Sequence, residues 1–146
     1  MDLVCNIAKG RTAEKVADGA NLIVVLLKAA QADGVLRDHA TLAALLAATG
    51  NTEANFTNYS RKTILNTALV LTVDNTNDRT RLDTADLSWA SAGGTVNNSL
   101  VKALVCEDVG GADTSRVPLL AYDYPYVTSG TALPLVFHAD GLLQIT

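Results

Sequence analysis

Two apolar runs separated by a long polar connection constrain the fold of this chain most. Residues 69–73 and 100–106 are rich in Val and Leu and border turn-forming residues, a pattern typical of half or fully buried strands. Inside the connection, apolar residues at every second position, Ala85, Leu87 and Trp89, predict a shorter strand with one buried face. We expect Trp89 to be mostly buried and to anchor that strand.

Three further segments have the patterns of strands in the centre or at the edge of a sheet. Residues 22–28 form a continuous apolar run between turn formers, which predicts a strand buried on both faces. Residues 116–122 and 131–138 are also apolar but contain Pro118 and Pro134. Because proline cannot donate a hydrogen bond to a neighbouring strand, these two segments are predicted to be edge strands or strand ends.

Two weaker patterns complete the strand predictions. Residues 56–64 alternate bulky with polar side chains, which predicts a strand near a sheet edge. Near the end of the chain, Asp140 and Gly141 lie between apolar runs and predict a tight hairpin turn before a last strand at residues 142–145.

One segment changes to helical periodicity. Within residues 39–48, Leu42, Leu45 and Leu46 recur at spacings of three and four in a run of alanines. Thr41 or Asp38 can cap the start of this segment. The pattern predicts a single conspicuous helix of about three turns that packs against the sheet.

Short strands separated by frequent turn signals predict a mainly β fold, an antiparallel sandwich or barrel with one short α-helix. The length of 146 residues corresponds to a single domain, and 49% hydrophobic residues suffice for a core. Residues 1–18 mix Ile7 and Val16 with charged side chains, which suits a short amphipathic helix or an N-terminal arm.

The charge balance argues against nucleic acid as a partner. Fifteen acidic residues against eleven basic ones give a net charge of −4, whereas nucleic-acid binders need a basic patch to displace counterions. The longest apolar run, residues 22–27, is too short to span a bilayer, and no basic segment precedes an apolar run near residue 1. We expect a soluble protein made in a cytoplasm, with no membrane partner.

The two cysteines do not indicate a disulfide framework or a metal site. Cys5 and Cys106 lie far apart in the sequence, and neither has the close second cysteine expected of a zinc or redox motif. We interpret both as small buried hydrophobic residues.

An acidic cluster is the strongest candidate for a metal site. It consists of Asp74, Asp78, Asp83 and Asp86, and its carboxylates could hold calcium. The spacing fails the EF-hand pattern, and Arg79 and Arg81 lie inside the cluster, where they oppose a cation and can pair with the carboxylates. We expect a structural turn with surface ion pairs and no metal or cofactor.

No catalytic arrangement stands out. Two carboxylates could serve a glycosidase, but any chain with this many acids offers such a pair by chance. His39 and His138 have no second histidine or cysteine nearby, and no serine lies in a nucleophile elbow. The protein is therefore predicted not to be an enzyme.

Three tyrosines form the best candidate for an interaction surface. Tyr122, Tyr124 and Tyr126 alternate around Pro125, so an extended backbone would place all three on one face. Tyrosine packs its ring while its hydroxyl contacts water or a polar partner. This suits either a sheet surface covered by a loop or a subunit interface.

Four segments of the chain, in this order, resemble small structural proteins of tailed bacteriophages, of the head decoration or minor capsid kind. They are NIAKGRTAEKV, NFTNYSRKTI, VDNTNDRTRLDTADLSWASAGGTVNNSLVKALVCEDV and RVPLLAYDYPYVTSGTALPLVFHADGLLQIT. The most specific part is NDR followed by an aspartate and tryptophan element, a Gly-Gly turn and an apolar strand. Together the segments cover most of the chain.

The resemblance implies a virion component without enzymatic activity. We expect a protein on the capsid exterior, a decoration or cement protein or the base of a head fibre, with the major capsid protein as partner. A tail or head-tail connector protein and a carbohydrate-binding adhesive module are the alternatives. We expect a homo-oligomer, a trimer in the simplest case. Its interface residues are predicted to be Tyr122, Tyr124 and Tyr126, with Ile7 and Val16 in the arm.

Overall fold

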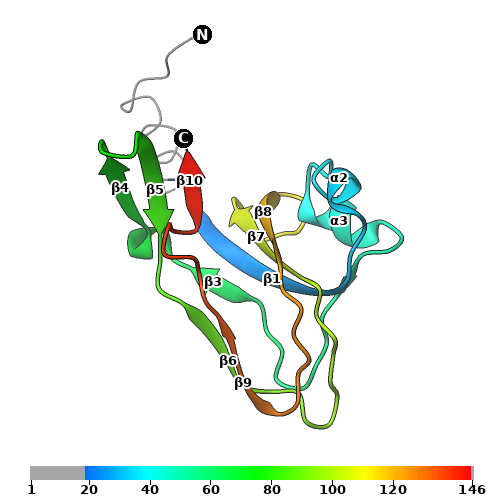
Figure 1. Ribbon diagram of the computed structural model, residues 1–146. Coiled ribbons are helices and arrows are strands. Elements are labelled where there is room, and N and C mark those ends of the chain that lie inside the picture. The colour runs from blue at the N-terminus through cyan, green and yellow to red at the C-terminus, as the bar shows by residue number, and fades with distance from the viewer. Residues whose placement is uncertain (1–18, 146) are drawn as a thin grey trace.

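The computed structural model describes residues 19–145, and these form a mainly β structure with two short helices (Figure 1). The predictions for Cys5, Ile7, Val16 and the N-terminal arm lie outside the described residues. The elements in chain order are β1 (Asn21–Ala29), α2 (Asp33–Leu36), α3 (Leu42–Ala47), β2 (Thr52–Glu53), β3 (Lys62–Ile64), the 3-10 helix η1 (Asn66–Ala68), β4 (Val70–Asp74), β5 (Arg79–Asp83), β6 (Leu87–Ala92), β7 (Lys102–Asp108), β8 (Val117–Asp123), β9 (Thr131–Leu135) and β10 (Leu143–Ile145).

The largest sheet has five strands and is built around β1. The order is β2-β1-β7-β8, and β3 pairs with the first half of β1 on the same side as β2. All pairs are antiparallel, and β1 pairs with β7 over the whole length of β7, from Asn21 opposite Asp108 to Leu27 opposite Lys102. The continuous apolar run of β1 thus forms a central strand.

Both faces of β1 are buried, as the sequence predicts. Residues 22–27 are at most 6% exposed. Ile23, Val25 and Leu27 point to one side, where they pack with Leu104 and Cys106 against the helices. On the other side Leu22, Val24 and Leu26 belong to the main core. The prediction that Cys106 is a buried hydrophobic residue is also confirmed.

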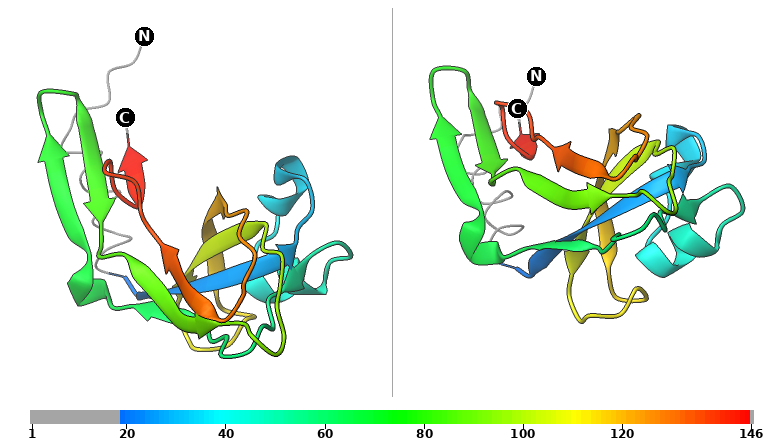
Figure 2. Two further views of the ribbon diagram at one scale, coloured as in Figure 1. Left: turned by 60° about the horizontal axis from the view of Figure 1, so that its bottom comes forward. Right: turned by 90° about the horizontal axis from the view of Figure 1, so that it is seen from below.

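The second layer of the sandwich is a two-stranded ribbon of β6 and β9. Its inner side chains, among them Trp89, Leu133 and Leu135, pack with the inner face of the five-stranded sheet. Figure 2 shows this ribbon crossing over β1 and β7. The result is a sandwich-like arrangement of antiparallel sheets that does not close into a barrel.

The two helices cover the opposite face of the five-stranded sheet. In α3, Leu42 and Leu45 are buried, and the side chain of Thr41 accepts a hydrogen bond from the backbone N–H of Ala44 at 3.2 Å. The N-cap prediction is therefore confirmed for Thr41. The sequence predicts one helix, whereas the structure has two. The second, α2, is not predicted because it spans only four residues, too few to show helical periodicity, and it buries Leu36 alone.

A smaller sheet projects from the sandwich, in the order β10-β5-β4 (Figure 1). We call it the projecting sheet. The chain passes from β5 into β6 and from β9 into β10, so the projecting sheet continues the β6–β9 ribbon. Where the projecting sheet meets the β6–β9 ribbon, the backbone N–H of Phe137 donates to the Asp86 carboxylate at 2.9 Å.

Several strand predictions hold and others are wrong. The proline-bearing segments form β8, at the edge of its sheet, and β9, in the two-stranded ribbon, as predicted. Residues 56–64 are not one strand, because a turn at Asn58, with φ of 69°, leaves only β3. Asp140 and Gly141 form a turn but no hairpin, since β10 pairs with β5 and not with β9.

Two details of the central stretch also differ from the prediction. Trp89 is buried as predicted, but Ala85 lies before β6 and is exposed. Residues 69–73 do form a strand, β4, but that strand is not buried, because Val70 is 59% and Val73 47% exposed. No helix within residues 19–145 is long and apolar enough to cross a membrane.

Candidate interaction surfaces

Of the three candidate tyrosines, Tyr122 and Tyr124 bind backbone carbonyls of the same chain, and Tyr126 is exposed. The Tyr122 hydroxyl donates to the carbonyl of Leu142, and the Tyr124 hydroxyl donates to that of Pro134. Burial raises the pKa of Tyr122 to about 12 and raises the pKa of Tyr124 as well. Residues 134–142 therefore cover these two rings within one chain.

Tyr126 differs, because it is 45% exposed while its ring lies 4.7 Å, centroid to centroid, from that of Tyr124. It belongs to the turn region at the end of the sandwich, where Val127 is also exposed and pairs with Ser99. The role of the tyrosines in a subunit interface stays a prediction. In this structure Tyr126 offers the exposed ring for it.

The acidic cluster is organised by hydrogen bonds within the β4–β5 turn. The Asp74 carboxylate accepts from the backbone N–H groups of Thr76 and Asn77, from the Asn77 side chain and from Arg79. The Asn77 side chain, followed by Arg79, lowers the pKa of Asp74 to about 2. Arg79 also pairs with Asp140 at 2.9 Å. The carboxylate thus fixes the turn and its charge is compensated.

Two further acids of this cluster bind backbone N–H groups. Asp83 accepts from the N–H of Thr84, and Asp86 accepts from the N–H of Phe137. In the part of the chain that the structure describes, no group of three or more His, Cys, Asp or Glu side chains is placed to hold a metal ion.

A second ion-pair network, which sequence reasoning missed, joins segments far apart in the chain. Arg61 makes two hydrogen bonds to Glu53, at 2.7 Å each, and two to Asp113, at 2.6 and 3.0 Å. Arg116 pairs with Asp108 and Asp113. The arginines lower the pKa of both aspartates. Arg61 thus binds the sheet to the loop at residues 109–116.

That loop in turn holds the start of α3. The N–H of Leu42 donates to the carbonyl of Arg116, and the N–H of Ala43 donates to the carbonyl of Asp113, both at 2.9 Å. These are N–H groups that have no partner inside a helix. The network is therefore structural: it joins sheet, loop and helix.

Lys102 forms a third set of ion pairs, with Asp33 and Asp123 at 2.6 Å each. The lysine lies at the start of β7, and Asp33 begins α2. Both carboxylates are largely exposed, so each pair contributes little stability. The contact positions α2 against the sheet, next to a hollow.

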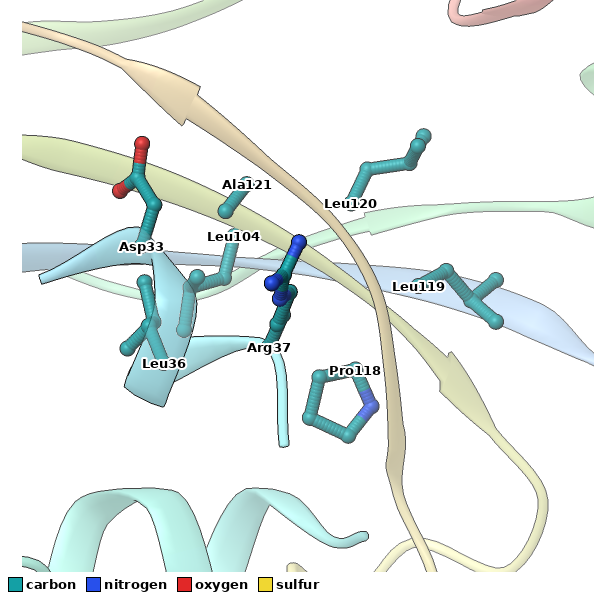
Figure 3. Close-up of a pocket in the computed structure, with 8 residues that line it drawn as sticks. All are labelled: Asp33, Leu36, Arg37, Leu104, Pro118, Leu119, Leu120 and Ala121. Atoms are coloured by element: carbon teal, nitrogen blue, oxygen red, sulfur yellow. The ribbon is translucent and has the colours of Figure 1, made fainter. Parts of the chain in front are cut away.

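This hollow, of about 250 Å³, lies between α2 and β8 (Figure 3). Its lining is mainly apolar: Leu36, Leu104, Pro118, Leu119, Leu120 and Ala121. Asp33 and Arg37 provide its charged groups. The hollow contains no nucleophile paired with a base, so its chemistry suits contact with an apolar group.

The histidines are engaged locally. His39 shares a hydrogen bond with the Gln31 side chain at 2.9 Å, and Gln31 also accepts from Asn51. His138 is exposed, beside Asp140. Neither lines the hollow beside α2.

Exposed apolar side chains lie on two edge strands and also in loops and in α2. Val70 and Val73 lie on β4, Val117 and Leu119 on β8, and Val136 between β9 and β10. Such residues, when not scattered singly, mark surfaces that contact other macromolecules. A groove of about 630 Å³ lies on the face of the projecting sheet that carries Val70, Thr72 and Arg81.

Comparisons with family models, with curated proteins and with solved structures find no match to this chain.

Proposed function

We propose that this protein is a non-enzymatic structural component of a tailed-bacteriophage particle. It is made in the host cytoplasm and sits on the capsid exterior as a decoration or cement protein or as the base of a head fibre. It acts as a homo-oligomer that binds the major capsid protein. The observation that carries the assignment is the resemblance of four segments, which cover most of the chain in the same order.

The geometry supports a role in binding protein surfaces. Arg61, Arg79 and Arg116 are each paired with two carboxylates, and these pairs hold turns and loops. Four of the exposed apolar residues, Val70 and Val73 of β4 and Val117 and Leu119 of β8, lie on edge strands, where another protein can add contacts. The net charge of −4 suits a protein that faces solvent on a particle and does not bind the packaged genome.

Localisation on particles tests this proposal. Antibodies against the purified protein should label the heads of phage particles whose genome encodes this sequence, and quantitative mass spectrometry should find many copies per particle. Antibody preadsorbed with the purified protein is the matched control and should label nothing. Particles of a deletion strain should bind the added protein at their heads.

The other outcomes identify the alternatives. Labelling confined to tails or to the neck would replace the head assignment with a tail or connector protein. Binding to host glycans by a protein that is absent from particles would favour an adhesive module and would reject the structural role.

A further inference from the structure

Strand β4 lies at an edge of the projecting sheet in the part of the chain that the structure describes. It pairs with β5 in an unbroken register, from Val70 opposite Asp83 to Asp74 opposite Arg79. Within residues 19–145 no strand pairs with its other side. Val70 and Val73 on this strand are 59% and 47% exposed. The edge thus combines unpaired backbone groups with exposed apolar side chains.

The fold protects the edge at β8 but not the edge at β4. In β8, Pro118 removes a backbone donor, and the register with β7 shifts between Val105 and Cys106. Proline, bulges and lysine are the devices that discourage pairing between sheet edges. The sequence of β4, VLTVD, contains no proline or basic residue, and its register has no bulge. β4 therefore has the features of an edge that can accept another strand.

We propose that β4 of one copy pairs antiparallel with β4 of a second copy of this chain. The inference deepens the proposed homo-oligomer and rests on it. Full overlap of the two five-residue strands puts Thr72 opposite Thr72 across a two-fold axis. The same register puts Leu71 opposite Val73 twice, and Val70 opposite Asp74 twice.

This register brings two of the three apolar side chains of β4, Leu71 and Val73, together. Leu71 lies opposite Leu82 of β5, and Val73 opposite Thr80, so Leu71 and Val73 share one face of the projecting sheet. In the pair, Val73 of each copy contacts Leu71 of the other, and its exposed side chain becomes covered. A shift by one residue would turn these side chains to the opposite face. The strand is therefore complementary to itself in this register, and registers shifted by one residue are excluded.

The polar face fits as well. Thr72 lies between Arg81 of its own copy and Thr72 of the other, and threonine pairs are favourable across strands. Asp74, which would face Val70 of the second copy, already has its charge compensated by Arg79. The pairing therefore places no uncompensated charge against an apolar side chain.

The shape of the molecule allows this contact. In Figure 2 the hairpin of β4 and β5 stands away from the sandwich, with β4 on the outer side. Two copies can meet at β4 with their sandwiches on opposite sides, which joins two three-stranded sheets into one of six strands. A two-fold contact of this kind is isologous, and it yields a dimer or an even-numbered assembly in place of the trimer expected from the sequence.

Charge substitutions at the symmetry axis test the register. Thr72 is exposed, so Thr72→Lys and Thr72→Glu should both fold; each places two like charges opposite each other in the pair. The matched controls are Thr63→Lys and Thr63→Glu, at an exposed threonine of β3. Light scattering coupled to gel filtration measures the mass of each protein, and circular dichroism confirms its fold.

We expect the wild type and both Thr63 variants to have twice the 15.3 kDa chain mass at tens of micromolar. Each Thr72 variant alone should have the mass of one chain, and an equimolar mixture of the lysine and glutamate variants should regain the double mass. A monomeric wild type, a trimer, or Thr72 variants that remain dimeric would each overturn the proposed contact. Particle labelling, measured separately, decides the proposed function in every one of these cases.

Discussion

The indole Nε1 of Trp89 donates a hydrogen bond to the backbone carbonyl of Ser60 across 2.6 Å, and the ring itself is 1% exposed. The bond joins β6 to the segment that precedes β3, so it ties the two layers of the sandwich together. We expect Trp89→Ala to lower the free energy of unfolding by about 3–5 kcal/mol, because it removes a large buried ring and leaves a cavity. Urea denaturation measures this change.

The variant Trp89→Phe is the control for the hydrogen bond. It keeps most of the buried apolar area but leaves the carbonyl of Ser60 without its partner, so its loss should be smaller than that of Trp89→Ala. A loss below about 1 kcal/mol for the alanine variant would contradict the role of Trp89 in the core.

Gly141 should be sensitive to substitution. Its φ is +92°, and a Cβ added there would lie 2.7 Å from the carbonyl oxygen of Leu82. We expect Gly141→Ala to destabilise the protein by about 2 kcal/mol or more, since strain and a backbone clash add. Gly34→Ala is the control, because no atom lies within 4 Å of its added Cβ and it lies in α2; this variant should be neutral or slightly stabilising in a thermal melt. Equal melting temperatures for both variants would show that the turn at Gly141 tolerates a side chain.

Removal of the Arg61 fork should weaken the joint between the sheet and the loop at residues 109–116. Arg61→Met leaves Glu53 and Asp113 without their shared partner, and we expect a loss of about 2 kcal/mol in urea unfolding. Arg61→Lys keeps the charge but not the planar fork, so it should recover only part of that loss. The control is Arg37→Met, at an exposed arginine without an ion pair in the described part of the chain, which should change stability by less than about 0.5 kcal/mol. Equal effects of the Arg61 and Arg37 variants would reject a structural role for the network.

Acid should destabilise the same network. The arginine partners lower the folded-state pKa of Asp108 and Asp113, so at pH near 4 the unfolded chain binds more protons than the folded chain. Their contribution to stability is therefore fully present above the unfolded pKa of about 3.9 and is lost as the pH falls through the lower folded values. Melting temperatures between neutral pH and pH 3 should decline mainly below about pH 4. Asp113→Asn should flatten this decline, and an equally steep decline in that variant would assign the acid sensitivity to other groups.

The sequence predicts the central strand well because the side chains on both of its faces are apolar. Residues 22–27 are apolar without interruption, and only a strand covered on both faces can bury them all. In residues 56–64 the alternation of bulky and polar side chains comes from turns and not from a strand. Phe56 and Tyr59 meet edge to face with centroids 5.1 Å apart, and the N–H of Tyr59 bonds back to the carbonyl of Phe56. Alternation in the sequence cannot distinguish these two geometries.

The candidate surfaces were harder to predict from the sequence, because they depend on how distant segments of the chain are placed in space. Arg61 and Asp113 are 52 residues apart in the sequence. They meet only because the fold brings the segment before β3 and the loop after β7 together. The exposure of β4 likewise depends on the projecting sheet standing away from the sandwich. Its apolar sequence alone predicts burial.

The projecting sheet is joined to the sandwich by three connections of the described chain: η1 leads from β3 into β4, residues 84–86 lead from β5 into β6, and residues 136–142 lead from β9 into β10. Three connections restrict the rotation of the projecting sheet relative to the sandwich more than one or two connections would. The first connection enters the five-stranded sheet and the other two enter the β6–β9 ribbon. A force applied to the β4–β5 hairpin is therefore transmitted to both layers of the sandwich.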